Sequence, residues 1–249
     1  MSERVLMYDF PGSICCQMVR VTLAEKGVAY DKQTIDISQK REQFDAWYTA
    51  LNPKAVVPTL AIGDEIIIDT LNIVPAIDAR FDGPSLTPAD PETAQAMRDW
   101  MRDVMAPHYG VMLYSRFLDE NRQSATIIGR GDELRKLRAE RPEAAALLDK
   151  RIAGNERLQR ILADEAEVRK HLDGVATMLD RLEQALGETQ FVVSDSWTLA
   201  DGFWTAALAR FEKHGLDAWS DGSMPRVAAY YARLQARPSW AAAGIDNGK

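Results

Sequence analysis

Cysteine and histidine are scarce in this sequence, which has two cysteines and three histidines among 249 residues. The cysteines are neighbours, Cys15 and Cys16, and two adjacent cysteines make a strained disulfide, so we expect free thiols. The histidines, His108, His171 and His214, lie far apart in the sequence and lack ligand spacing with one another and with the cysteines. The sequence therefore predicts no metal site.

Long apolar runs and an excess of positive charge are also absent. No run approaches the roughly 18 apolar residues of a transmembrane helix, and the N-terminus lacks the basic-then-apolar pattern of a signal peptide. We therefore expect a cytoplasmic protein without a membrane partner. The formal net charge of -7 argues against a nucleic-acid-binding protein, because such proteins usually present a basic patch to the phosphates. The 46% hydrophobic content is enough for a globular core.

Strand-like and helix-like patterns alternate in the first part of the chain. It starts with an apolar strand, a helix with 3.6-residue periodicity that ends at Gly27, and a second alternating strand. A helix, two β-rich runs around a turn, and a helix that begins near Thr70 follow. The sequence thus predicts the order βαβαββα, with elements over 4–10, 15–27, 28–37, 41–52, 56–62, 66–69 and from 70 onward.

The stretch 82–91 interrupts all periodicity with prolines and a glycine, which predicts a linker. The patterns after it are helical. We therefore predict an α/β domain over 1–81, followed by an all-helical domain over 92–249.

Three features stand out in the predicted helical domain. Apolar residues recur every three or four positions from Leu158 to Leu186, which predicts one long helix packed within the domain, with a coiled-coil partner as the alternative. The charged segment 129–174 predicts solvent-exposed helices. Thr198 lies three residues before Asp201, which predicts a capping box at the start of a buried helix, with a catalytic aspartate as the alternative.

The motif VVPTL precedes the predicted hairpin, and TLAD lies in the predicted helical domain. Together with the order of the elements, they resemble the glutathione transferase superfamily over nearly the whole chain. The stretches LNPKAVVPTL and DTLNIV are similar to zeta-class maleylacetoacetate isomerases and bacterial tetrachlorohydroquinone reductive dehalogenases. The same relatives share the spacing S-x-C-x-x-x-V-R, here Ser13, Cys15, Val19 and Arg20. The resemblance implies an N-terminal thioredoxin-like domain, a C-terminal helical bundle domain, glutathione as cosubstrate, and a homodimer.

The resemblance also implies which residues bind glutathione. Val57, which precedes Pro58 in a cis peptide bond, pairs its backbone with the peptide. Asp69 and Thr70 stand at a helix start, where backbone N–H groups and a hydroxyl hold the γ-glutamyl carboxylate and the acid meets the ammonium. Gln43 lies near the glycine end of glutathione in this interpretation, and an exposed polar residue on a helix is the alternative.

The catalytic residues implied by the resemblance are Ser13 and Cys15. The Ser13 hydroxyl is directed at the glutathione sulfur, where a hydrogen bond favours the thiolate. Cys15 lies in the first helical turn, where the macrodipole favours a thiolate that attacks sulfur. A packed thiol without a chemical role is the alternative for Cys15. Cys16 matches no catalytic position, and we expect a small buried residue there.

The other substrate is expected to be a small electrophile, bound over Ser13 between the domains. Its predicted wall consists of Met105, His108, Tyr109 and Met112, and core packing is the alternative. The leading hypothesis is a detoxifying glutathione transferase that acts on an aromatic or quinonoid compound, specifically by reductive dehalogenation of a halogenated hydroquinone. The alternatives are cis-trans isomerisation of a maleyl-type acid, cleavage of aryl ethers, and ligand binding without catalysis.

Overall fold

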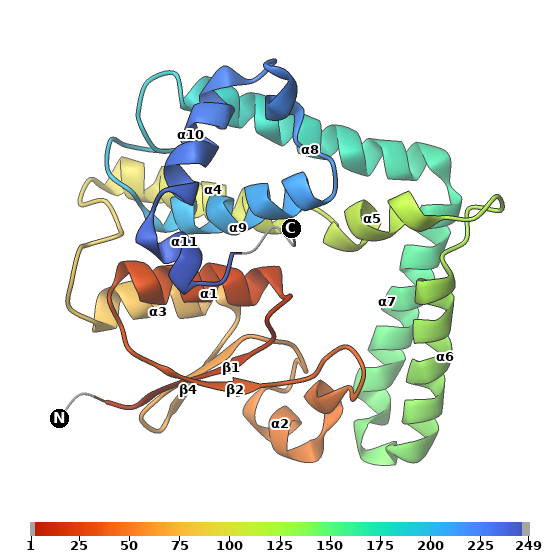
Figure 1. The fold of residues 1–249 in the computed structure, drawn as a ribbon. Helices are drawn as coiled ribbons and strands as arrows, with labels where there is room; N and C mark the ends of the chain where they lie inside the picture. The colour runs from red at the N-terminus through yellow and green to blue at the C-terminus, as the bar shows by residue number, and fades with distance from the viewer. Residues whose placement is uncertain (1–2, 246–249) are drawn as a thin grey trace. The chain divides into compact units, whose positions relative to one another are not determined.

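The computed structural model describes residues 3–245, which begin with a mixed β-sheet (Figure 1). The strands are β1 (Val5–Asp9), β2 (Asp31–Thr34), β3 (Thr59–Ile62) and β4 (Glu65–Ile68). They form a four-stranded sheet in the order β2-β1-β3-β4. β1 pairs in parallel with β2 and antiparallel with β3, and β3 pairs antiparallel with β4. The apolar central strands β1 and β3 are buried, whereas the polar edge strand β2 is exposed.

Three α-helices alternate with these strands. They are α1 (Ile14–Glu25), α2 (Ala46–Leu51) and α3 (Thr70–Arg80), and the short 3-10 helix η1 (Glu42–Phe44) precedes α2. The predicted order βαβαββα is confirmed. The helices α1 and α3 pack against each other on one face of the sheet (Figure 1). Gly27 has φ +66°, a left-handed conformation that ends the α1 segment because glycine adopts it without strain.

From α3 onward, the described chain is helical and adds no strand. The larger helices are α4 (Pro91–Met105), α5 (Tyr109–Tyr114), α6 (Ala125–Glu140), α7 (Ala145–Ala163), α8 (Glu165–Ala185), α9 (Leu199–Lys213), α10 (Pro225–Gln235) and α11 (Pro238–Ala242). Within residues 3–245, none of these helices combines the length and apolar character that a bilayer span requires. The predicted fold class, α/β followed by all-α, is confirmed.

The chain forms two compact units. One comprises the residues up to Ala106 together with those from Leu179 onward, and the other comprises residues 107–178. In the first unit, α1 packs against α9 and α11 as well as α3, and α4 packs against α9. Helices from the end of the chain therefore share a unit with the sheet. The domain limits predicted from the sequence stay a prediction.

The predicted single helix over 158–186 is wrong, because α7 and α8 are separate helices that meet at Asp164. This residue has an extended backbone, with φ -97° and ψ 111°. Its carboxylate accepts hydrogen bonds from the N–H groups of Ala166 and Glu167 at 2.9 and 3.3 Å. Asp164 thus satisfies the unpaired N–H groups at the start of α8. The apolar residues keep their spacing across Asp164, so periodicity alone does not reveal that the helix is interrupted there.

The predicted capping box at α9 is confirmed. The Thr198 N–H and hydroxyl donate to the Asp201 carboxylate at 2.7 and 2.9 Å. Asp201 is fully buried and also accepts hydrogen bonds from the Tyr230 hydroxyl at 2.6 Å and the Val192 N–H at 3.1 Å. Burial raises the pKa of Asp201, and these four donors oppose the rise. The carboxylate therefore joins α9, α10 and the loop before α9, which supports the structural interpretation.

Candidate active site

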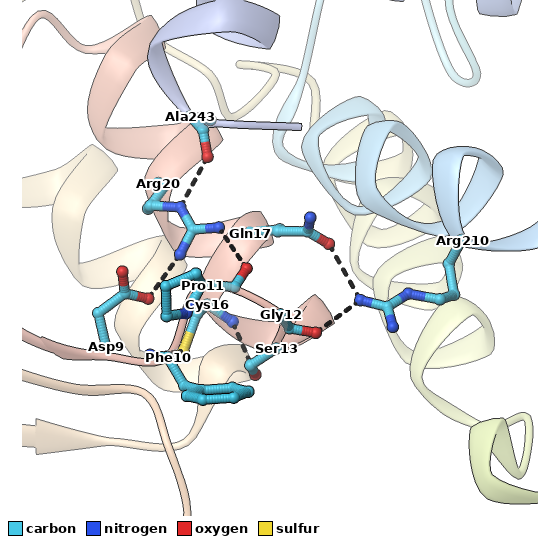
Figure 2. A network of polar contacts seen from close by, with 10 residues as sticks. All are labelled: Asp9, Phe10, Pro11, Gly12, Ser13, Cys16, Gln17, Arg20, Arg210 and Ala243. Carbon is cyan, nitrogen blue, oxygen red and sulfur yellow. Dashed lines mark hydrogen bonds and ion pairs between the residues drawn. The ribbon is translucent and has the colours of Figure 1, made fainter. Parts of the chain in front are cut away.

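The loop after β1 and the first turn of α1 form the centre of the candidate site (Figure 2). Ser13 is the N-cap residue of α1, and its Oγ accepts a hydrogen bond from the Cys16 N–H at 3.3 Å. Serine is favoured at this position because its oxygen satisfies an N–H group that the helix start leaves unpaired. This bond uses a lone pair of the oxygen, so the hydroxyl keeps its proton to donate elsewhere.

A buried ion pair between α1 and β1 stabilises the same loop. Arg20 of α1 and Asp9 of β1 are both buried, with 2.6 Å between Nη1 and Oδ1. The Arg20 guanidinium also donates to the Ala243 carbonyl at 2.7 Å and to the Pro11 carbonyl at 3.0 Å (Figure 2). A buried charge is stable only with its partners in place, so these contacts fix the turn in one geometry.

Cys15 lies in the first turn of α1 and is half-buried. Burial is the main cause that raises the pKa of its thiol, and the Asp69 carboxylate raises it further. A hydrogen bond from the Thr70 side chain and the charge of Arg210 lower it. The net direction is upward, opposite to the one expected from the macrodipole. Thr70 and Arg210 are therefore the side chains that favour the thiolate form of Cys15.

Cys16 is fully buried, and its Sγ accepts a hydrogen bond from the Phe10 N–H at 3.5 Å. Burial raises the pKa of this thiol well above its ordinary value. The environment agrees with the expected small buried residue, because a thiol in apolar surroundings is inert.

The peptide-binding position predicted at Val57 lies just before β3. The Val57–Pro58 bond is cis, as the resemblance implies. Val57 is only 7% exposed, and its N–H and C=O have no hydrogen-bond partner among residues 3–245. Backbone polar groups of buried segments are nearly always paired, and the pairing of this donor and acceptor with a peptide ligand stays a prediction.

Asp69 and Thr70 stand at the N-terminus of α3, as predicted. Asp69 has φ +78°, and its carboxylate accepts from the Leu71 N–H at 3.3 Å and pairs with the Lys54 ammonium at 3.0 Å. Thr70 is buried, and its side chain is one of the causes that lower the pKa of the Cys15 thiol. The start of α3 therefore acts on the thiol at the start of α1. The sequence analysis related Thr70 to a carboxylate of glutathione and gave no effect on the thiol.

Gln43 lies in η1 and is 8% exposed, so the alternative of an exposed polar residue is wrong. Its Oε1 is buried and has no hydrogen-bond partner within the described residues. A buried acceptor left unpaired destabilises the fold and points to a missing donor. The peptide N–H of a bound ligand can supply that donor.

The four residues of the predicted substrate wall occupy different settings. Met105 ends α4 and is half-buried, whereas Met112 in α5 is 1% exposed and packs in a core. His108 precedes α5 and Tyr109 is its first residue, and both are half-buried. The wall stays a prediction for all four residues.

Two of the three histidines are closer in space than their sequence positions indicate. The rings of His108 and His171 lie 5.8 Å apart between centroids. Burial is the main cause that lowers the pKa of His108, and the neighbouring His171 lowers it further. Across residues 3–245, the side chains of His, Cys, Asp and Glu form no cluster of three or more that is suited to a metal ion.

Arg210 of α9 also belongs to the site, although no sequence pattern predicted it. Its guanidinium donates to the Gly12 carbonyl at 2.7 Å and to Gln17 Oε1 at 3.4 Å (Figure 2). The only sequence feature that marks Arg210 is a basic residue within an otherwise apolar stretch of helix, which does not identify a partner 198 positions away.

A four-stranded mixed sheet with a cis-proline before β3, followed by an all-helical region, is the architecture of a glutathione-dependent class of enzymes. Residues 7–85 match the family model described as "Glutathione S-transferase, N-terminal domain". Residues 132–233 match "Glutathione S-transferase, C-terminal domain". The chain belongs to the glutathione S-transferase family, whose members use glutathione as cosubstrate.

Relatives cover nearly the whole chain. "Tetrachloro-P-hydroquinone reductive dehalogenase" of Sphingobium chlorophenolicum is 32% identical over 97% of this chain and 96% of its own. "Glutathione S-transferase TCHQD" of Arabidopsis thaliana is 26% identical over 94% of this chain and 87% of its own. Among solved structures, the beta-etherase LigF from Sphingobium sp. strain SYK-6 shares the fold, with a TM-score of 0.73, 23% identity, and coverage of 96% and 98%.

Proposed function

We propose that this protein is a glutathione-dependent reductive dehalogenase of a halogenated hydroquinone. The observation that carries the proposal is the pairing of a hydroxyl and a thiol at the start of α1. Ser13 has a proton to donate to the glutathione sulfur, and Cys15 lies two residues further on, where Thr70 and Arg210 favour its thiolate form. The Ser13 hydroxyl activates the glutathione sulfur, and the Cys15 thiolate attacks the same sulfur in a later step. The 32% identical relative from Sphingobium chlorophenolicum, named for this activity, supports the same substrate class.

The residues around the thiol fit glutathione. The N–H and C=O of Val57, which have no partner among residues 3–245, can pair with the backbone of its cysteinyl residue. The unpaired Gln43 Oε1 can accept its glycyl N–H. Asp69 offers a carboxylate to the γ-glutamyl ammonium, and the first N–H groups of α3 offer donors to the adjacent carboxylate.

The proposed reaction has three covalent steps. The glutathione thiolate forms a bond to the ring carbon, and the halide leaves with the electron pair of the carbon–halogen bond. The Cys15 thiolate then attacks the thioether sulfur, so a disulfide forms, the carbon–sulfur bond breaks, and the ring carbon takes the electron pair and a proton. A second glutathione thiolate attacks the mixed disulfide and regenerates Cys15. Oxidation of two glutathione molecules to one disulfide supplies the two electrons that reduce the ring.

Replacement of Cys15 tests this proposal. With glutathione and a chlorinated hydroquinone, Cys15→Ser should still release chloride but accumulate the glutathionyl thioether, because no enzyme thiolate is present to cleave it. Mass spectrometry of the products measures the thioether, and intact-protein mass spectrometry detects glutathione on Cys15 of the parent protein.

Cys16→Ser is the matched control, because serine keeps an acceptor for the Phe10 N–H. This variant should form the reduced product at a rate close to that of the parent. The proposal is wrong if Cys15→Ser forms the reduced product at the parental rate and the parent protein carries no glutathione.

One alternative has a specific observation in its favour. Cis-trans isomerisation of a maleyl-type acid requires transient addition of glutathione, and therefore Ser13, but no enzyme thiolate. The raised pKa of Cys15 favours a reaction of this kind. Recording glutathione consumption and chloride release together distinguishes the two, since isomerisation consumes no glutathione and releases no halide.

We further propose that the protein is a cytoplasmic homodimer that detoxifies electrophiles. Family membership supports the dimer. Analytical ultracentrifugation tests it, and a monomer at micromolar concentration contradicts it.

A further inference from the structure

Two arginines hold consecutive carbonyl groups of the turn that leads into α1. Arg20 donates to the Pro11 carbonyl at 3.0 Å, and Arg210 donates to the Gly12 carbonyl at 2.7 Å (Figure 2). Arg20 lies in α1 itself, whereas Arg210 comes from α9 in the helical part of the same compact unit. The turn is therefore fixed from two elements that are far apart in the sequence, directly before Ser13.

The position of Arg210 is itself well defined. Its second contact, at 3.4 Å, is to Oε1 of Gln17, a residue that is 7% exposed in α1. The helix α9 that carries it packs against α1. Both hydrogen bonds come from Nη2, so one nitrogen of the guanidinium serves both acceptors. Arg210 thus places a positive charge at the start of α1 in a fixed orientation.

We propose that Arg210 is a positioning residue for the thiol chemistry: it orients the Pro11–Ser13 turn from α9 and stabilises the negative charge that develops at Cys15. The effect of this role on turnover rests on the proposed function. The hydrogen bonds to the two carbonyl groups and the positive charge are present in the protein without a ligand, so the role itself can be tested on the protein alone.

Several groups act on the Cys15 thiol, and the test must separate the effect of Arg210 from the effects of the others. Asp69 opposes the thiolate, whereas Arg210 and the Thr70 hydroxyl favour it. Asp69 is itself paired with Lys54. Arg210 is a cation of α9 that acts on the thiol. Its removal takes away one of the groups that oppose Asp69, so the proportion of thiolate should fall.

The experiment compares Arg210→Gln, Arg210→Lys and the parent protein by the pH dependence of Cys15 alkylation with iodoacetamide. We expect Arg210→Gln to slow alkylation at neutral pH about threefold to tenfold and to move its pH midpoint upward by about 0.5 to 1 unit. Arg210→Lys keeps the charge and should recover at least half of this shift. Peptide mass spectrometry assigns the alkylated thiol, and Cys15→Ser supplies the blank.

The matched control is Arg102→Gln, which removes an exposed arginine of α4 that pairs with Asp99. It should leave the midpoint unchanged. Thiolate ultraviolet absorbance, corrected with Cys15→Ser, gives the midpoint independently if alkylation is slow. Equal midpoints in Arg210→Gln and Arg102→Gln overturn the proposal, and so does the absence of a Cys15 titration in both measurements. A change in melting temperature without a change in midpoint indicates a structural role and also overturns it. Neither measurement uses glutathione or a halogenated compound, so failure of the proposed function is a separate result.

Discussion

Replacement of Ser13 should separate two roles of one hydroxyl. Its oxygen caps α1 by accepting the Cys16 N–H at 3.3 Å, and its proton is available to the glutathione sulfur. Ser13→Ala removes both the cap and the proton. Ser13→Gly removes the proton but keeps most of the stability, because glycine is tolerated at an N-cap. The two variants therefore differ in stability and agree in chemistry.

The expected magnitudes follow from these contacts. Ser13→Ala should lower the free energy of unfolding by about 1 kcal/mol, and Ser13→Gly by about 0.3 kcal/mol. A hydrogen bond to a charged group contributes about 1.5 to 3 kcal/mol. Ser13 is half-buried, so solvent screens the sulfur and the lower figure applies. Since about 1.4 kcal/mol corresponds to one pKa unit, the pKa of bound glutathione should rise by about one unit in both variants.

Titration of the thiolate absorbance of bound glutathione measures this pKa, and urea unfolding measures stability. Turnover below the pKa should fall about tenfold in both variants, while glutathione affinity at high pH changes little. If the thiolate titrates at the parental pH in Ser13→Gly and Ser13→Ala, the Ser13 hydroxyl does not act on the sulfur. The N-terminus of α1 would then be the main source of activation.

Two further predictions concern Gln43 and Asp36. Gln43→Met removes a buried acceptor that has no partner, so it should raise the free energy of unfolding by about 1 kcal/mol while weakening glutathione binding severalfold in calorimetry. Gln235→Met, at an exposed position of α10, is its control, and unchanged affinity contradicts the assignment of Gln43. Hydrogen bonds from the Gln39 N–H and the Ser38 side chain lower the pKa of Asp36 to about 2, below an unfolded value of about 3.9. Asp36 therefore stabilises the fold above about pH 4 and loses this effect as the pH falls toward 2, so Asp36→Ala should be less stable at pH 7 and approach the parent near pH 2. A stability difference that stays constant over this range excludes the effect.

Features encoded by neighbouring residues were predictable from the sequence. The capping box joins Thr198 and Asp201, three positions apart. The apolar and β-rich runs that predict β1 and β3 arise because each strand buries its own side chains. In all these cases, the physical cause lies within a few residues of the pattern, so a local pattern is sufficient.

The electrostatics of the site were not predictable in this way. Arg210 and Gly12 are separated by 198 positions, and their contact depends on how α9 packs against α1. The direction of the Cys15 pKa is set mainly by burial, which outweighs the causes that lower it. Gln43 has a polar side chain, and only the tertiary structure reveals that it is buried. Helical periodicity specifies which face of α9 is apolar but not which carbonyl its arginine meets.

The hydrogen bond between Arg20 and the Ala243 carbonyl links the site to the order of protein synthesis. The two residues are separated by 223 positions, and Arg20 also holds the Pro11 carbonyl. A nascent chain that has emerged only through α9 contains the sheet, α1 and Arg210, but its Arg20 guanidinium lacks one of its buried acceptors. The turn before Ser13 is completed only when the last helices have left the ribosome. The last contact of the buried Arg20 guanidinium therefore forms late in synthesis.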